Sequence, residues 1–183
     1  MSEATNRSET GRFKGIVRPL VEEDLPQIRP ILETWLKDRG TGELEKAEVE
    51  EDLGLMRDSC KVGNERAYFV AEEPDGQVIG VIGMTSPSEV MHQFTVTRNP
   101  VELVNAYVAK EHRSGRGVGS ALVARLEDEA RRREYTEVAF NSGPRYKDTA
   151  WGFYDNLPGY SRVGVAEKLY GEGGDAPVWS KIL

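Results

Sequence analysis

Residues 102–130 read ELVNAYVAKEHRSGRGVGSALVARLEDEA, and this stretch decides the fold. Its first part is apolar and rich in strand-forming residues, which predicts a central β-strand. Three glycines follow at positions 115, 117 and 119, and the apolar residues after them recur at helical spacing. A glycine-rich turn between a strand and a helix leaves backbone N–H groups free at the helix N-terminus. The stretch therefore predicts a binding site for an anion.

Two common phosphate-binding loops do not fit this turn. The P-loop requires Gly-Lys followed by Ser or Thr, and that triplet does not occur in the sequence. The dinucleotide fingerprint G-x-G-x-x-G fails because the spacing here is G-x-G-x-G and the strand is not N-terminal. A turn with no ligand is the remaining alternative, and Arg113 and Arg116 beside the glycines argue against it. We therefore expect the pyrophosphate of another ligand.

The composition describes an ordinary globular protein. The chain has 183 residues, of which 38% are hydrophobic and 30% charged, and this length suits one domain. The net charge of −7 argues against general nucleic-acid binding. Cys60 is the only cysteine, so neither an internal disulfide nor a cysteine-based metal cluster is expected. No apolar run approaches the roughly 20 residues of a membrane helix, and we expect a cytoplasmic protein. Residues 1–12 are polar and are expected to form a disordered tail, and residues 13–183 a single domain.

The rest of the chain alternates between predicted strands and helices. Strands are expected at 13–20, 66–73, 77–86, 136–142, 161–171 and 176–183, and helices at 22–40, 42–63, 119–133 and 147–157. In the first helix Asp24 and Gln27 form a capping-box pattern, and Pro30 should kink or restart the helix. The segment 92–97, HQFTVT, is either an extra strand or an extension of a neighbour.

This order of elements predicts an α/β fold. The strand-helix-strand unit over 102–142 should be parallel, while the rest of the sheet can be antiparallel. We therefore expect one mixed, mostly antiparallel sheet with helices on both faces.

Three segments resemble the GNAT superfamily of N-acyltransferases. These are VRPLVEEDLPQI at 17–28, ELVNAYVAKEHRSGRGVGSALV at 102–123 and AWGFYDNLPGY at 150–160. The second is similar to the family's acyl-CoA signature [QR]-x-x-G-x-[GA], and the third to its segment A-x-x-F-Y-x-x-x-G-[FY]. The three occur in the family's order and at about its spacing. The resemblance implies the GNAT fold and acetyl-CoA as the acyl donor, with no metal.

The chain departs from these patterns in two turns. The [QR] position of the signature falls on Ser114, and Arg113 stands one residue too early. In the third segment Pro158 is inserted before Gly159. Single insertions in turns cost little, so the family pattern is kept while the register of the phosphate loop stays open.

The resemblance also implies the cofactor-binding residues. Tyr107, Val108 and Ala109 would offer backbone groups to the pantetheine arm, and Asn141 its side-chain amide. The alternative for Asn141 is a turn residue. Arg145 and Lys147 could meet the 3′-phosphate or be solvated. The pyrophosphate would bind Arg113, Ser114, Gly115, Arg116, Gly117, Val118, Gly119 and Ser120.

The reaction needs a base and an acid, because the attacking amine must lose a proton and the departing thiolate must gain one. The family often places a glutamate where Glu102 stands, and burial there should raise its pKa. The alternative is a solvated or paired strand-end charge. His92 is the rival base, Glu89 a weaker third, and water alone remains open. The family's motif tyrosine corresponds to Tyr154, whose alternative role is that of a core aromatic.

The acceptor is the least determined partner. We expect a small primary amine, and the acidic residues after position 42 could attract a cation or simply form a solvated helix face. A homodimer through the C-terminal strands is possible, and so is a place for those strands inside their own sheet. The rival classes are a non-catalytic acyl-CoA sensor or interaction domain of the same fold, and a nucleotide-binding module.

Overall fold

The structure is a computed structural model that describes residues 12–113 and 115–183. The expected N-terminal tail therefore lies outside the described residues, apart from Arg12. The strands are β1 (Ile16–Pro19), β2 (Ala67–Glu72), β3 (Val78–Thr85), β4 (Pro100–Val108), β5 (Glu137–Asn141), β6 (Ser161–Ala166) and β7 (Ala176–Ile182). The α-helices are α1 (Leu25–Trp35), α2 (Lys46–Ser59), α3 (Glu89–His92), α4 (Val118–Arg132) and α5 (Gly152–Asp155). Short helical turns are η1 (Glu22–Asp24), η2 (Lys110–His112), η3 (Pro144–Tyr146) and the π-helical η4 (Lys147–Trp151).

The seven strands form one sheet in the order β1-β2-β3-β4-β5-β7-β6. Only the β4–β5 pair is parallel, and the other neighbours are antiparallel. This confirms the predicted mixed sheet with one parallel strand-helix-strand unit. β7 lies between β5 and β6, so both of its edges are paired within the chain.

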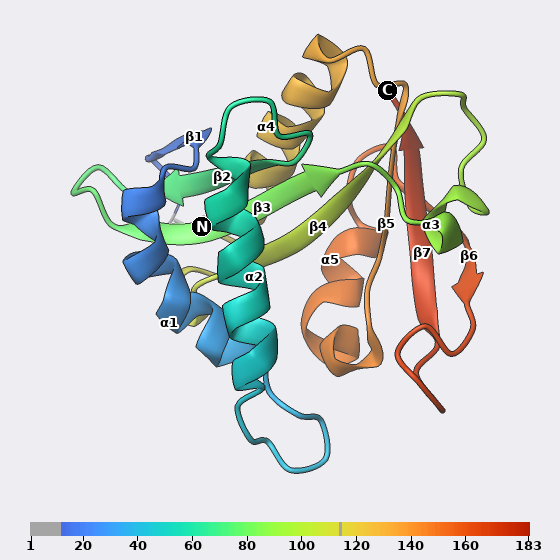
Figure 1. Cartoon of the computed structure of the whole chain (residues 1–183), viewed down its shortest axis with the longest axis horizontal. Coiled ribbons are helices and arrows are strands. Elements are labelled where there is room, and N and C mark those ends of the chain that lie inside the picture. The colour runs from blue at the N-terminus through green and yellow to red at the C-terminus, as the bar shows by residue number, and fades with distance from the viewer. Residues whose placement is uncertain (1–11, 114) are drawn as a thin grey trace, which may run out of the picture.

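Helices cover both faces of this sheet (Figure 1). α1 and α2 pack their apolar stripes on one face, where Ile28, Leu32 and Met56 are fully buried against β2 and β3. α4 covers the opposite face, where Leu122 and Leu126 are buried in a separate and larger cluster. Burial of this kind contributes about 1.5–3 kcal/mol for each large apolar side chain. The two clusters hold the sheet rigidly between the helices.

The parallel pair β4–β5 separates soon after it begins. β5 pairs with β4 only at Pro100, Val101 and Glu102, while β4 continues to Val108 along β3. β4 also carries a bulge at this point, where Asn105 has a left-handed backbone with φ of 51°. Bulges bend a strand and end regular pairing. Figure 1 shows β4 and β5 diverging from their point of contact.

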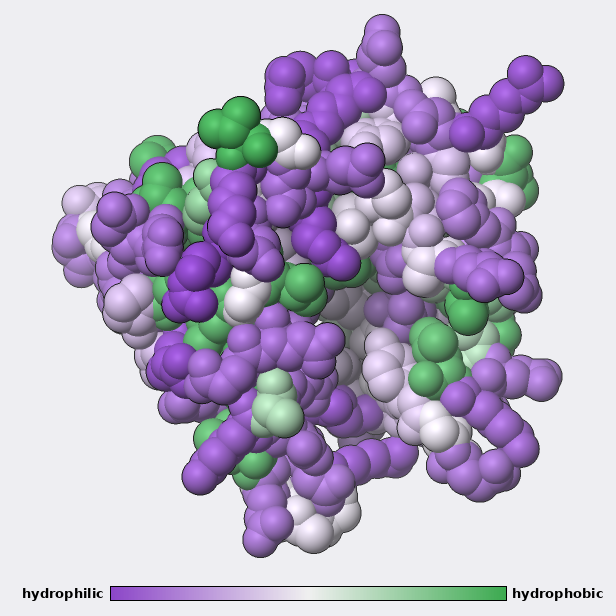
Figure 2. All heavy atoms as spheres, viewed as in Figure 1, coloured by the Kyte–Doolittle hydropathy of each residue, from purple (hydrophilic) through white to green (hydrophobic). Residues whose placement is uncertain are grey.

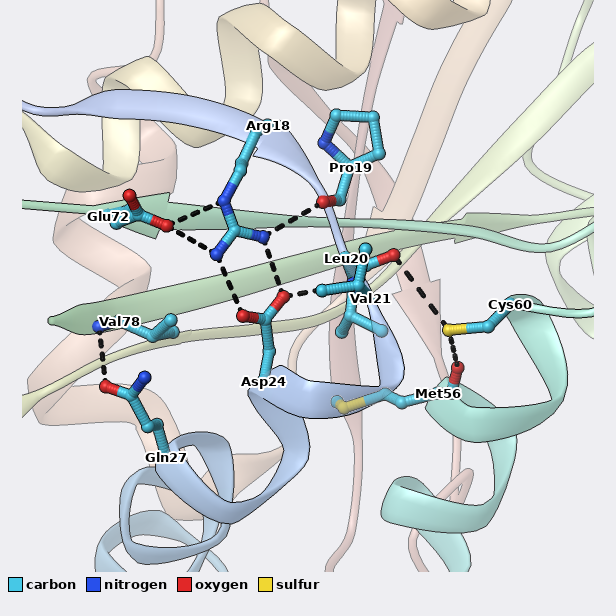
Figure 3. Close-up of polar contacts among 10 residues, drawn as sticks. All are labelled: Arg18, Pro19, Leu20, Val21, Asp24, Gln27, Met56, Cys60, Glu72 and Val78. Carbon is cyan, nitrogen blue, oxygen red and sulfur yellow. Dashed lines mark hydrogen bonds and ion pairs between the residues drawn. The ribbon is translucent and has the colours of Figure 1, made fainter. Parts of the chain in front are cut away.

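The start of α1 differs from the expected capping box. Figure 3 shows that Asp24 accepts hydrogen bonds from Arg18, at 2.7 and 2.8 Å, and from the Val21 amide at 3.0 Å. Gln27 accepts from the Val78 amide at 3.1 Å and so reaches β3. The capping-box prediction was therefore wrong, because both side chains have partners outside the helix. Arg18 also contacts Glu72, so this network ties β1 and β2 to α1.

Two further local predictions need correction. Pro30 does not restart the helix, because α1 runs without a break from Leu25 to Trp35, and the kink at Pro30 stays a prediction. The helix interior loses one N–H there, and the buried stripe holds the helix together. Residues 93–98 form no strand. Instead α3, capped by the Ser88 hydroxyl, precedes an irregular segment in which Phe94 packs against Gly164 of β6.

Candidate active site

The separation of β4 from β5 opens a cavity of about 1010 Å³. This volume is at the upper end of the range for small-molecule and cofactor sites. The walls come from α1, α2, β4, the start of α4, the end of β5 and the segment from η3 to α5. Figure 2 shows the surface hollowed beside α2. We call the part near α4 the donor end and the part near α2 the acceptor end.

The donor end is built around the N-terminus of α4. Gly117 caps the helix with φ of +82°, and Gly115 has φ of +84°, a conformation that favours glycine. The first helical bond runs from the Ala121 amide to the Gly117 carbonyl. The amides of residues 118–120 therefore have no partner within the helix. These three residues line the cavity. Ser114 lies outside the described residues. This arrangement can bind an anion, as the sequence predicts.

Gly119 serves a packing role. A Cβ at this position would lie 3.0 Å from the ring of Phe153 in α5. The glycine therefore lets α5 approach the start of α4, and the two elements close one side of the donor end.

The two arginines of the loop both have partners inside the protein. Arg116 contacts Glu73 at 2.6 Å and His112 at 2.6 Å. Arg113 lies over the Trp35 ring, 4.5 Å from its centroid, and donates to the Thr149 carbonyl. Arg113 thus bridges α1 and η4 across the cavity. A phosphate-binding role for either guanidinium stays a prediction.

The segment predicted to contact pantetheine lines the cavity only in part. Tyr107 and Val108 line the cavity, but Ala109 does not. The Ala109 amide donates to Ile79 at 2.8 Å, and its carbonyl accepts from His112 at 2.9 Å. Residues 103–106 of β4 also line the cavity and were not singled out from the sequence. No sequence pattern marks where two parallel strands separate. A role for residues 107–109 in binding pantetheine stays a prediction.

Asn141 stands at the opposite wall of this gap and lines the cavity. Its side-chain nitrogen contacts the Met91 sulfur at 3.5 Å, and its oxygen accepts from the Tyr170 hydroxyl at 2.7 Å. A ligand amide would have to compete with these partners, so the predicted role of Asn141 remains open to test.

Glu102 reaches the cavity from β4, and its side chain is almost fully buried. One carboxylate oxygen accepts from the Ser88 amide at 2.9 Å. Burial raises the pKa of Glu102, although its contacts with Ser88 oppose this shift. The rivals His92 and Glu89 are exposed on α3 and do not line the cavity. Of the three candidate bases, Glu102 alone lies in the site.

Tyr154 also lines the cavity, from α5. Its ring packs against Phe140 and Trp179, with centroids 4.7 and 5.3 Å away, and burial raises its pKa. The hydroxyl has no hydrogen-bond partner among the described residues. It therefore keeps its proton at neutral pH and is free to donate it to a ligand.

Three other tyrosines line the same cavity and were not singled out for their side chains. The hydroxyls of Tyr107 and Tyr146 lie 3.4 Å apart, and that of Tyr170 donates to Asn141. They come from three separate segments, so no local sequence signal groups them. Their bonded hydroxyls contrast with the free hydroxyl of Tyr154.

The acceptor end is lined by charged side chains. Glu45, Glu48 and Asp52 face the cavity from the start of α2. Arg145 of η3 donates to Glu48 at 2.9 Å and so closes the cavity across to α2. Arg145 is therefore engaged at the acceptor end, and Lys147 does not line the cavity. The sequence left open whether the acidic residues after position 42 form a solvated face. Glu45, Glu48 and Asp52 line the cavity, whereas Glu43, Glu50 and Glu51 are exposed.

The sequence matches a known protein family. Residues 29–160, well over half of the chain, match the acetyltransferase (GNAT) family. The chain belongs to the GNAT acetyltransferase family. The GNAT match spans the strand, loop and helix of the donor end. No curated protein matches the chain by sequence.

Solved structures share the GNAT fold. The ribosomal-protein-alanine N-acetyltransferase from Brucella melitensis has a TM-score of 0.69 at 24% identity, covering 92% of this chain and 99% of its own. YncA from Salmonella typhimurium, solved with its cofactor acetyl-CoA, has a TM-score of 0.68 at 21% identity, with coverage of 93% and 94%. A GCN5-related N-acetyltransferase from Kribbella flavida has a TM-score of 0.64 at 22% identity, with coverage of 91% and 96%.

The described residues contain neither a candidate membrane-spanning helix nor a candidate metal-binding cluster. None of the helices there is long and apolar enough to cross a membrane. Within the same residues, no group of three or more His, Cys, Asp or Glu side chains is arranged to hold a metal ion.

Proposed function

We propose that this GNAT protein transfers the acetyl group of acetyl-CoA to a primary amine of a small molecule, by direct attack of the amine on the thioester. One observation carries the proposal. Glu102, a buried carboxylate with a raised pKa, lines the same cavity as the N-terminus of α4. A candidate base and an anion cradle thus share one cavity.

The donor end fits acetyl-CoA. The amides at the start of α4 would hold the pyrophosphate. The β4 segment from Leu103 to Val108 lines the cavity after β5 has left it. Such a strand edge can pair with the amides of an extended pantetheine arm as an added strand would. When bound, acetyl-CoA supplies the acetyl group as a thioester.

The chain's own residues move the protons. A free alkylammonium has a pKa near 10.4, so at neutral pH it must lose a proton before it can attack. Glu102 accepts that proton, directly or through water, and passes it to solvent. A bond forms between the amine nitrogen and the acetyl carbon while the carbon–sulfur bond breaks. Tyr154 donates its proton to the departing sulfur, and the second proton that the nitrogen loses as the amide forms returns to Tyr154, directly or through water.

The shape of the acceptor end favours a small molecule. Arg145 spans from η3 to Glu48 of α2, and Tyr170, Glu172, Gly173 and Gly174 also line the cavity. The ion pair between η3 and α2 narrows the access to the cavity on this side. A narrowed cavity admits a small amine more readily than a folded protein surface.

A thiol-release assay with acetyl-CoA and a panel of amines tests the proposal. We expect release of free thiol in proportion to the acetylated amine detected by mass spectrometry. Tight binding of CoA with no release from any amine would instead favour an acyl-CoA sensor. Failure to bind CoA would overturn the assignment of the donor end.

A further inference from the structure

The acceptor end contains a buried carboxylate with an unsatisfied oxygen. Asp52 of α2 is 8% exposed and lines the cavity. Its Oδ2 is buried and has no hydrogen-bond partner within the part of the chain that the structure describes. Buried polar atoms are normally paired, and an unpaired one calls for an explanation. A donor supplied from the cavity would satisfy it.

Asp52 lies beside the bulge of β4. Asn105, which has a left-handed backbone, is close enough to the Asp52 carboxyl to lower its pKa. The Asn105 oxygen accepts from the Tyr68 hydroxyl at 2.7 Å, and this bond orients the Asn105 amide beside Asp52. Side chains fixed in this way pre-organise a binding site.

The charges facing Asp52 favour a cation as its partner. Burial raises the pKa of Asp52 to about 6, with Glu48 and Glu51 of its own helix adding to the rise. Asn105 and Arg145 act in the opposite direction. Among the described residues, no cationic side chain is hydrogen-bonded to Asp52 Oδ2.

Arg145 raises the alternative of an anionic acceptor group, because its Nη1 is also buried without a partner. Its other terminal nitrogen, however, is already bonded to Glu48. Six carboxylates line the cavity as a whole against four arginines, and one of those arginines is engaged at Thr149. Acidic side chains therefore outnumber basic ones in the cavity.

We propose that the acceptor carries a second cationic group besides the amine that is acetylated, and that Asp52 binds this second group. The inference rests on the proposed function and names its substrate class, an aliphatic diamine or a related dication. Glu102 and Asn105 are three positions apart on β4, which is about 10 Å along a strand. The two ammonium groups would therefore be joined by a short alkyl chain.

The test compares three amines of similar length by calorimetry, with CoA bound to the protein. These are 1,4-diaminobutane, butylamine and 4-aminobutanoate. A charge-assisted contact to Asp52 should make the diamine bind about 10- to 100-fold more tightly than butylamine. In Asp52→Asn the two should bind within about threefold of each other. Glu51→Gln removes the same charge from the exposed side of α2 and should keep the wild-type preference.

The outcomes separate this inference from the proposed function. If the diamine binds no more tightly than butylamine, or if Asp52→Asn keeps the preference, the inference is overturned. If 4-aminobutanoate binds more tightly than the diamine, the acceptor end binds an anion through Arg145, and the inference is overturned as well. If the diamine binds tightly through Asp52 but releases no thiol from acetyl-CoA, the cation site stands and the proposed activity fails.

Discussion

The two ends of the cavity are built from different chemical groups. The donor end uses backbone amides and glycines, and its two arginines have partners inside the protein. The acceptor end uses carboxyl groups, and Glu102 and Asp52 both have raised pKa values there because burial disfavours their charged forms. Burial of carboxyl groups at the acceptor end lowers the free energy of unfolding, and the donor end carries no such penalty. A substitution in the glycine loop should therefore lower the stability of the protein, whereas removal of the Asp52 charge should raise it.

The largest effect is expected at Glu102. Glu102→Gln removes the base and should lower kcat by about 100- to 10,000-fold, while CoA affinity stays within about twofold because the donor end is untouched. Steady-state thiol release and calorimetry with CoA measure the two quantities. Glu89→Gln, on the exposed surface of α3, is the matched control. Equal losses of CoA binding and turnover would show that the two ends are not separable.

Tyr154→Phe should give the next largest effect, a fall in kcat of about 10- to 1000-fold from the loss of the proton donor. Tyr160→Phe is a fair comparison, because Tyr160 is buried in the same apolar cluster but does not line the cavity. Rapid-quench measurement of acetyl transfer distinguishes the two. An unchanged rate in Tyr154→Phe would mean that water protonates the sulfur.

Gly117→Ala tests the donor end. A side chain at φ of +82° costs about 1–2 kcal/mol, and the distorted helix start should raise the KM for acetyl-CoA by roughly tenfold. Chemical unfolding and steady-state kinetics give both values. Gly54→Ala, in the middle of α2 with open space around it, should instead raise stability by about 0.5–1 kcal/mol. A stable Gly117→Ala variant with normal KM would contradict the anion cradle.

Asp52→Asn tests the acceptor end. It should modestly raise the stability of the protein, whereas Gly117→Ala should lower it. The folded pKa of Asp52 is about 6 against a usual value of 3.8, so the folded protein holds this proton more tightly than the unfolded chain. The ionised carboxyl therefore lowers the free energy of unfolding above pH 6, and this penalty fades as the pH falls toward 4. The variant should be about 1–2 kcal/mol more stable at pH 8 and nearly equal to wild type at pH 4. Urea titrations at both pH values check this, and equal stability at pH 8 would contradict the burial of an ionised Asp52.

The difference between the ends also explains what the sequence could predict. The strand, loop and helix start of the donor end lie within one continuous stretch from Leu103 to Ser120, so glycine spacing and strand pattern reveal them. The acceptor end combines α2, η3, β4 and the loop at 170–174, which are far apart in the chain. The acidic residues after position 42 suggested a surface that attracts a cation or a solvated helix face, but not that Glu45, Glu48 and Asp52 line a cavity. The sequence also could not show that Ala109 lies outside the cavity lining, because the point where β4 and β5 separate depends on tertiary pairing.

Local signals failed where a side chain had a more distant partner. Asp24 and Gln27 match a capping box in sequence, yet Arg18 and the Val78 amide compete successfully for them. Pro30 stayed inside α1 because burial of the helix outweighs one missing hydrogen bond. In each case tertiary contacts decided the outcome.

The most direct test of the account is the pH dependence of kcat/KM for wild type and Glu102→Gln, with acetyl-CoA and a primary amine as substrates. We expect the wild-type rate to rise with pH along a limb set by Glu102, above the usual carboxyl value of 4.5. In Glu102→Gln that limb should disappear, and the rate should follow deprotonation of the free amine toward pH 10. Superimposable profiles would contradict Glu102 as the base that activates the acceptor.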